Sequence, residues 1–140
     1  MAIQFIPAPG MVLMCDFGPV IADIKPPGLM VGPLSVPPEM TKVRFVVILT
    51  QSVSRVGTCI VVPLSTKRPN PVKAHHHCIV QGTYRFLGGA EDSWVKADML
   101  SAVSTQRLDR VLDNGRYTSP SLSTEDFATV RKCVSVSLGF

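Results

Sequence analysis

The fold of this chain is constrained most strongly by residues 42–66, KVRFVVILTQSVSRVGTCIVVPLST. Two runs rich in β-branched residues, 43–50 and 58–64, flank a short polar segment that ends at Gly57. This pattern predicts two strands joined by a hairpin. The runs are apolar on both faces, so we expect them to be central strands of a sheet.

Polar side chains mark one end of this hairpin. Arg44 lies at the start of the first run, and the hydroxyl pair Ser65 and Thr66 closes the second run after Pro63. Antiparallel pairing brings the start of the first strand close to the end of the second. The sequence therefore predicts a guanidinium beside a hydroxyl at one rim of the sheet, and this rim is the candidate functional site.

The remaining segments are less regular. Residues 11–17, MVLMCDF, predict a first strand. Residues 18–41 hold six of the 12 prolines and three glycines, so they predict a long loop that is mobile until a ligand or partner covers it. Further strands are predicted at 75–81 and 93–103, whereas residues 104–114 fit either a helical turn or a last strand.

The C-terminal segment predicts one amphipathic helix. Ser123 and, three residues later, Asp126 form a capping-box pattern, while Leu122 and Phe127 suit a hydrophobic staple. Apolar residues then recur at helical spacing, at Phe127, Val130, Val134 and Leu138. About five short strands with this helix predict a single domain over residues 1–140. Its class is mainly β (α+β): a small, strongly bent SH3-like barrel with a C-terminal helix.

Composition narrows the partners and the compartment. Lys and Arg exceed Asp and Glu by 14 to 10, a modest excess that suits nucleic acid or an acidic protein without establishing either. Only 17% of the residues are charged, so we expect a partner to cover part of the surface. The apolar runs are too short for a membrane span and no signal-peptide pattern is present, so we expect a cytoplasmic protein with no membrane partner. The four cysteines lack a paired motif, and no disulfide is expected.

Four segments, in this order, resemble the PemK/MazF family of toxin ribonucleases from bacterial toxin and antitoxin pairs. They are PAPGMVLMCDF, KVRFVVILT, TCIVVPLST and WVKADMLSAVSTQRL, and together they span most of the chain. Two positions depart from the family pattern, because Phe45 follows Arg44 in place of Pro and Ser65 stands in place of Thr. A strand position tolerates Phe better than Pro. Ser65 keeps the hydroxyl, although serine is freer than threonine at χ1.

The resemblance implies a particular fold and activity. Family members are small barrels that share the CcdB fold and form homodimers. They cut single-stranded mRNA at specific sequences without metal or another cofactor, and leave a 2′,3′-cyclic phosphate and a 5′ hydroxyl. A cognate antitoxin protein neutralises them. The family's catalytic residues fall on Arg44, Ser65 and Asp98, and Lys96 falls where some branches carry a basic residue.

Cleavage through the ribose 2′ hydroxyl needs a base, a proton donor for the departing 5′ oxygen, and positive charge for the transition state. Arg44 suits the third role, because its planar fork can hold two phosphate oxygens and stays charged. Asp98 is the candidate base. Ser65, with Thr66 as the alternative, would donate a hydrogen bond to a phosphate oxygen. Contacts with RNA are expected from Thr66, Lys67, Arg68, Lys73 and Lys96.

Simpler interpretations of these residues stay open. An arginine that opens a strand is often part of a structural ion pair, and Asp98 with Lys96 could be an exposed pair on one strand face. The basic turn around Lys67 could be a solvated turn. Trp94 and Phe86 could stack on bases, or could belong to the core or to a dimer interface.

The run from His75 to His77 raises the question of a metal site. In a strand, His75 and His77 face one way and His76 faces the other, so at most two of them can converge on an ion. We therefore expect no bound metal, and interpret the run as a half-exposed edge strand.

Two functions without catalysis remain as alternatives. One is a gyrase poison similar to CcdB, because such proteins rely on a bulky residue near the C-terminus and this chain ends in Leu138, Gly139 and Phe140. The other is a degenerate toxin that binds RNA or the antitoxin without cutting. Substitution of Arg44 separates the ribonuclease from the gyrase poison, since only the ribonuclease should lose toxicity.

Overall fold

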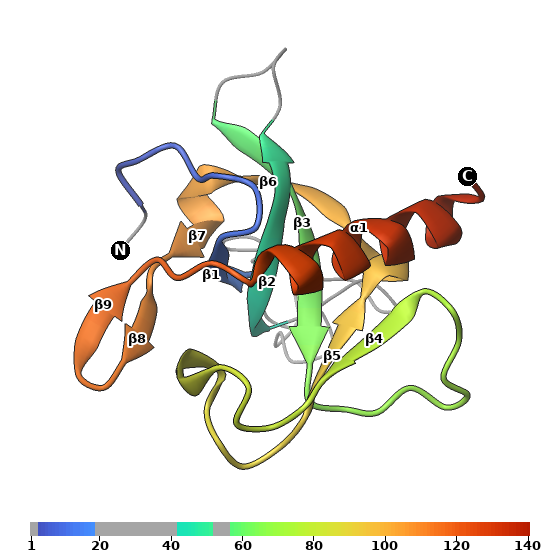
Figure 1. The fold of residues 1–140 in the computed structure, drawn as a ribbon. Coiled ribbons are helices and arrows are strands. Elements are labelled where there is room, and N and C mark those ends of the chain that lie inside the picture. Colours follow the sequence, from blue (N-terminus) through green and yellow to red (C-terminus); the bar gives the residue numbers. More distant parts are fainter. Residues whose placement is uncertain (1–2, 19–41, 52–56) are drawn as a thin grey trace, which may run out of the picture.

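The protein folds as a mostly antiparallel sheet with one C-terminal helix (Figure 1). The structure is a computed structural model, and it describes residues 3–18, 42–51 and 57–140. The proline-rich loop predicted at 18–41 lies outside the described residues except for Gly18, and so does the turn of the central hairpin at 52–56. The predicted fold class is confirmed, although the hydrogen-bonded order of the described strands does not close into a barrel.

The two central strands form as the sequence predicts. β2 (Val43–Gln51) pairs antiparallel with β3 (Thr58–Ser65), in a register that places Val46 opposite Pro63. β2 has β1 (Val12–Asp16) on its other side, and β3 also pairs with β5 (Ser93–Lys96) and β6 (Ser101–Ser104). Both strands are therefore interior strands, which explains why their sequences are apolar on both faces.

Shorter strands surround this pair. They are β1 (Val12–Asp16), β4 (His76–Ile79), β5 (Ser93–Lys96), β6 (Ser101–Ser104) and β7 (Leu108–Asp109). The order across the sheet is β4-β5-β3-β2-β1-β7, with β6 paired to β3. A second, two-stranded sheet of β8 (Val111–Asp113) and β9 (Arg116–Thr118) projects beside β1 (Figure 1). β4 is the half-exposed edge strand that the histidine run predicted.

Residues 93–103 do not form the single strand that their sequence predicted. A 3-10 turn, η3 (Ala97–Met99), separates β5 from β6. Both strands pair with β3, but β5 pairs with the end of β3 and β6 pairs with the beginning of β3, so the chain must turn between β5 and β6. The sequence of residues 104–114 fits either a helical turn or a strand, and the structure contains both. The 3-10 turn η4 (Thr105–Arg107) leads into β7 and β8.

The sheet buries apolar side chains on both faces. Val47, on β2, belongs to the core that the C-terminal helix α1 (Thr124–Leu138) covers, and its neighbour Val46 belongs to the core on the opposite face. Side chains alternate between the faces of a strand, so each run supplies both cores. The first core also contains Val12, Val62, Leu64, Ile79, Val95, Val130 and Val134, and the second contains Leu13, Cys15, Ile48, Val61, Val103 and Leu108.

The C-terminal helix α1 (Thr124–Leu138) begins as the capping pattern predicts. The side-chain oxygen of Ser123 accepts a hydrogen bond from the backbone N–H of Asp126 at 3.1 Å. The helix ends at Gly139, whose φ of 83° is the left-handed conformation that glycine adopts most easily. These caps fix both ends of the element that covers the first core.

Most of the predicted apolar stripe of α1 faces the sheet. Val130 and Val134 are buried, and Phe127 packs at the edge of the same core. Leu138 was predicted on the same stripe but is 52% exposed, because the last turn of the helix extends past the sheet (Figure 1). In the part of the chain that the structure describes, no helix has the length and apolar character needed to cross a membrane.

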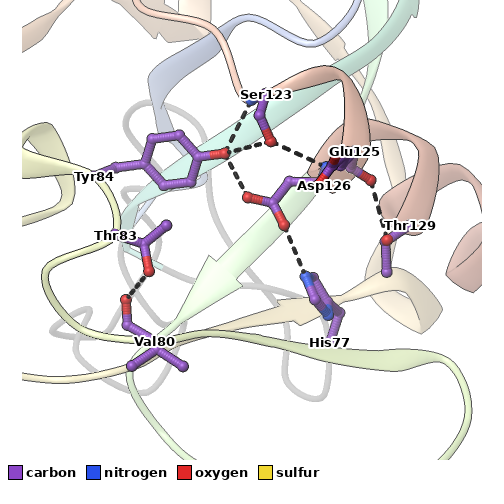
Figure 2. A network of polar contacts seen from close by, with 8 residues as sticks. All are labelled: His77, Val80, Thr83, Tyr84, Ser123, Glu125, Asp126 and Thr129. Carbon is purple, nitrogen blue, oxygen red and sulfur yellow. Dashed lines mark hydrogen bonds and ion pairs between the residues drawn. The ribbon is translucent and has the colours of Figure 1, made fainter.

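A polar network ties the start of α1 to β4 and to the loop that follows it (Figure 2). One carboxylate oxygen of Asp126 accepts a hydrogen bond from the hydroxyl of Tyr84, and the other lies 3.3 Å from Nε2 of His77. The backbone N–H of Ser123 donates to Tyr84 at 2.9 Å, so Tyr84 takes the place of the acidic side chain in a complete capping box. Burial opposes ionisation of Asp126, but the hydrogen bonds from Tyr84 and His77 outweigh it and lower the pKa of the carboxyl group.

This lowered pKa predicts an acid-sensitive helix contact. Asp126→Asn should lower the free energy of unfolding at pH 7 by about 1–3 kcal/mol, because it removes a charged partner of Tyr84 and His77. The wild-type advantage is complete above the ordinary carboxyl pKa of about 4, and disappears as the pH falls below it toward the lowered value in the fold. Urea unfolding at pH 7 and pH 3 measures this. Glu125→Gln, beside it in the first turn, is the matched control, and equal losses in both variants would contradict the prediction.

Candidate active site

Arg44 and Ser65 lie at the same rim of the sheet. Val46 of β2 pairs with Pro63 of β3 at the end of their ladder. Arg44 lies two residues before Val46, and Ser65 lies two residues after Pro63. Two steps along a strand return to the same face. Both side chains therefore belong to the face of Val46, which is opposite to the face that α1 covers.

β5 and β4 extend this face beyond β3. Trp94 is opposite Ser65 in the ladder between β5 and β3, and Lys96 is opposite His76 in the ladder between β5 and β4. Trp94 and Lys96 share a face because they are two residues apart. The result is a surface across four neighbouring strands, which we call the basic face, defined by Arg44, Ser65, Trp94, Lys96 and His76.

The charges on the basic face act on one another. Partial burial lowers the pKa of Lys96, the positive charges of Lys67 and Arg44 lower it further, and the carboxylate of Asp98 opposes them. The positive charges of Lys67, Arg44 and Lys96 therefore lie close enough to repel one another, which costs free energy. A bound anion would offset that cost, so the face is suited to a phosphate group.

Ser65 and Thr66 differ in their surroundings. Ser65 is the last residue of β3 and is half-buried, and its Oγ accepts a hydrogen bond from the backbone N–H of Lys67 at 3.1 Å. A hydroxyl that accepts one bond can still donate another. Thr66 follows the strand and is exposed. The hydroxyl of Ser65 is thus held in place at the rim by a hydrogen bond and keeps its own hydrogen available for donation.

The basic turn after β3 lies against the same face. The guanidinium of Arg68 lies 5.8 Å from the centre of the Trp94 ring, a distance typical of a cation–π contact. Lys67 and Lys73 are exposed on this turn. Phe86, in contrast, packs with Tyr84 against the core under α1, so it is not part of the basic face.

Asp98 lies in η3 beside an imidazole that the sequence analysis did not pair with it. Nε2 of His75 is 3.7 Å from Oδ1 of Asp98. His75 precedes β4, and its ring centre is 4.1 Å from that of His76. The expectation that His75 and His77 share a strand face is therefore wrong, because the strand begins one residue later than predicted.

His75, His76 and Asp98 form a cluster whose ligand atoms all lie within 4.8 Å of one another. Nδ1 of His76 accepts a hydrogen bond from the backbone N–H of Lys73 at 3.0 Å, so the neutral ring carries its hydrogen on Nε2. A metal-bound histidine normally donates from its second nitrogen rather than accepting there. The positive charges of Lys73 and Lys96 also repel a cation at this position. The donor set therefore does not favour a metal site.

The chain matches a toxin family model over nearly its whole length. The family model described as PemK-like, MazF-like toxin of type II toxin-antitoxin system matches residues 9–138. The protein YifN of Escherichia coli K12 is 34% identical, with 99% of this chain and 95% of YifN covered. This chain belongs to the PemK-like, MazF-like family of toxins from type II toxin-antitoxin systems.

Solved structures agree with this assignment at the level of the fold. A MazF from Deinococcus radiodurans superposes with a TM-score of 0.59 at 13% identity, over 98% of this chain and 100% of that one. An endoribonuclease from a mycobacterial species, solved with its cognate antitoxin, gives a TM-score of 0.57 at 17% identity, over 96% and 97% of the two chains. The arrangement of strands and terminal helix is thus that of the MazF-like toxins.

Proposed function

We propose that this chain is a sequence-specific endoribonuclease toxin that cuts single-stranded mRNA without a metal ion. The ribose 2′ hydroxyl attacks the adjacent phosphorus and leaves a 2′,3′-cyclic phosphate and a 5′ hydroxyl. The observation that carries the proposal is the convergence of Arg44, Ser65 and Lys96 on one face of a sheet in a chain of this toxin family.

Each of these side chains has a role that its chemistry suits. Arg44 stabilises the extra negative charge that develops on the phosphate oxygens in the transition state. Ser65 donates its hydroxyl hydrogen to a phosphate oxygen, while its oxygen stays bonded to the N–H of Lys67. Lys96, whose pKa is lowered chiefly by partial burial, adds positive charge that needs an anionic partner.

The function is tested by incubating the purified protein, free of antitoxin, with a long single-stranded RNA in excess EDTA. We expect discrete cuts at a recurring short sequence. An intact RNA with a folded protein would contradict the proposal, and so would cutting that requires added Mg²⁺.

Lys67 and Lys73 are proposed to hold the RNA backbone. Each lysine that pairs with a phosphate of a single strand contributes about 0.7 to the slope of log affinity against log salt. Lys67→Gln together with Lys73→Gln should therefore flatten that slope by about 1.4. Fluorescence anisotropy with a 2′-O-methyl RNA, which cannot be cut, measures this. Lys132→Gln, exposed on α1, is the control, and an unchanged slope in the double variant would remove both lysines from the RNA path.

The partners are proposed from the relatives. A mycobacterial endoribonuclease was solved with its cognate antitoxin, and MazF from Deinococcus radiodurans was solved with MazE. We extend this to a cognate antitoxin for this chain, and separately propose a homodimer in the cytoplasm as the active form. Light scattering of the purified toxin measures its mass, and a monomer at micromolar concentration would contradict the dimer.

A gyrase poison remains the second candidate because of one feature. Phe140, the last residue, is 91% exposed at the end of α1, where a partner can reach it. Deletion of Phe140 should leave RNA cleavage unchanged. Loss of toxicity on deletion of Phe140, with toxicity retained in Arg44→Ala, would favour the gyrase poison.

A further inference from the structure

An imidazole and a carboxylate lie together at the outer edge of the basic face. Nε2 of His75 is 3.7 Å from Oδ1 of Asp98, and the two side chains are 19% and 48% exposed. Both residues lie close to Lys96. The carboxylate of Asp98 raises the pKa of Lys96. Lys96 is opposite His76 in the ladder between β5 and β4, and the ring of His76 lies against that of His75. The pair is thus part of the same charged surface as Arg44.

We propose that His75 is the general base that takes the proton of the ribose 2′ hydroxyl, and that Asp98 is a positioning residue that holds His75. This inference rests on the proposed ribonuclease function, and it changes the role that the sequence suggested for Asp98. In general, an imidazole with a pKa near 6.5 is a better base at neutral pH than a carboxylate with a pKa near 4. A carboxylate beside the imidazole then stabilises the positive ring that forms, as in a Ser-His-Asp triad.

The orientation of the ring supports this role. Nε2 of His75 lies 3.7 Å from Oδ1 of Asp98, so a neutral ring that donates to this carboxylate as the contact shortens carries its hydrogen on Nε2 and its lone pair on Nδ1. That nitrogen has no hydrogen-bond partner within the described residues 3–18, 42–51 and 57–140. His76 is different, because its Nδ1 is already occupied by the N–H of Lys73. Of His75 and His76, only His75 therefore has an Nδ1 that is available to accept a proton. The separation of 3.7 Å is that of the free enzyme, and such contacts often shorten when substrate binds.

The order of the strands places His75 and Arg44 on opposite sides of Lys96 and Ser65. His75 precedes β4 and Arg44 lies near the start of β2, while Lys96 on β5 and Ser65 on β3 lie between them. An in-line displacement needs the attacking and leaving oxygens on opposite sides of the phosphorus. His75 would act at the attacking side and Arg44 at the phosphate and leaving side.

The step balances without another reagent. Nδ1 of His75 takes the 2′ proton as the bond between the 2′ oxygen and phosphorus forms. The bond between phosphorus and the 5′ oxygen breaks, and the departing oxygen takes a proton from water. The imidazolium later returns its proton to the hydroxide that remains, so no water is consumed.

A substrate with sulfur in place of the bridging 5′ oxygen tests the assignment, because a thiolate leaves without needing a proton. His75→Gln should cut normal RNA at least about a hundredfold more slowly than wild type, and the same deficit should persist with the 5′-thio RNA. Asp98→Asn should slow the cutting of both substrates because the ring of His75 loses its carboxylate partner, and Asp98→Glu, which keeps the carboxylate, should restore part of the rate. His77→Gln, which faces α1, should keep the wild-type rate and lose thermal stability instead.

Each outcome decides the inference. If the 5′-thio substrate restores the rate of His75→Gln, the residue is a proton donor and the assignment as base is wrong. If His75→Gln cuts both substrates like wild type, the inference fails while the proposed ribonuclease stands. If wild-type protein cuts neither substrate, both are overturned. A lower melting temperature for His75→Gln than for His77→Gln would assign His75 to the fold rather than to the reaction.

Discussion

Replacing Arg44 with alanine should slow RNA cleavage by about a thousandfold and leave the protein folded. In the proposed mechanism Arg44 supplies the charge that faces the phosphate, and removal of one such group commonly costs about 10²–10³ in rate. It is the second residue of β2 and shares a face with Ser65 and Lys96, so no other arginine among the described residues has the same position in the strand ladders. Single-turnover cleavage of an RNA that contains the mapped site measures the effect.

Two variants make this measurement specific. Arg116→Ala removes an exposed arginine from β9, outside the basic face, and should cut like wild type. Arg44→Lys keeps the charge but loses the planar fork, so it should retain only part of the activity. An Arg44→Ala protein that melts like wild type and cuts within a few fold of it would remove Arg44 from the mechanism.

The second large effect is expected at Ser65. Ser65→Ala should slow cleavage by about a hundredfold, because it removes the hydroxyl that we propose as the hydrogen-bond donor to the phosphate. Ser65→Thr should restore the rate, since threonine keeps the hydroxyl and limits its rotation at χ1. The same single-turnover assay measures both variants.

Thr66 provides the matched control for Ser65. It is exposed beyond the end of β3, so Thr66→Ala should change the rate little. The Ser65→Ala protein also loses the acceptor for the N–H of Lys67, so its melting temperature must be measured alongside. A larger loss in Thr66→Ala than in Ser65→Ala would transfer the role to Thr66.

The central hairpin was predictable because its sequence carries a complete local signal. The two apolar runs predicted interior strands, and antiparallel pairing alone was enough to bring Arg44 near Ser65. The capping pattern at Ser123 likewise predicted the start of α1. In each case a short stretch of sequence decides the outcome, with little help from the rest of the chain.

The features that sequence did not predict depend on residues far apart in the chain. The break at Ala97 follows from the pairing of β3 with two different strands. Tyr84 joins the cap of a helix that begins about forty residues later. His75 approaches Asp98 because β4 begins at His76, and a shift of one residue in a strand reverses the direction of a side chain.

Attack by the ribose 2′ hydroxyl is the central claim, and one substitution in the substrate tests it directly. Two RNAs that contain the mapped cleavage sequence are compared in excess EDTA, one unmodified and one with a single 2′-deoxy nucleotide on the 5′ side of the cut bond. We predict that the unmodified RNA yields a 5′ hydroxyl and a 2′,3′-cyclic phosphate, whereas the modified bond stays intact. Cleavage at the 2′-deoxy position would contradict the mechanism, because the attacking group would then come from elsewhere.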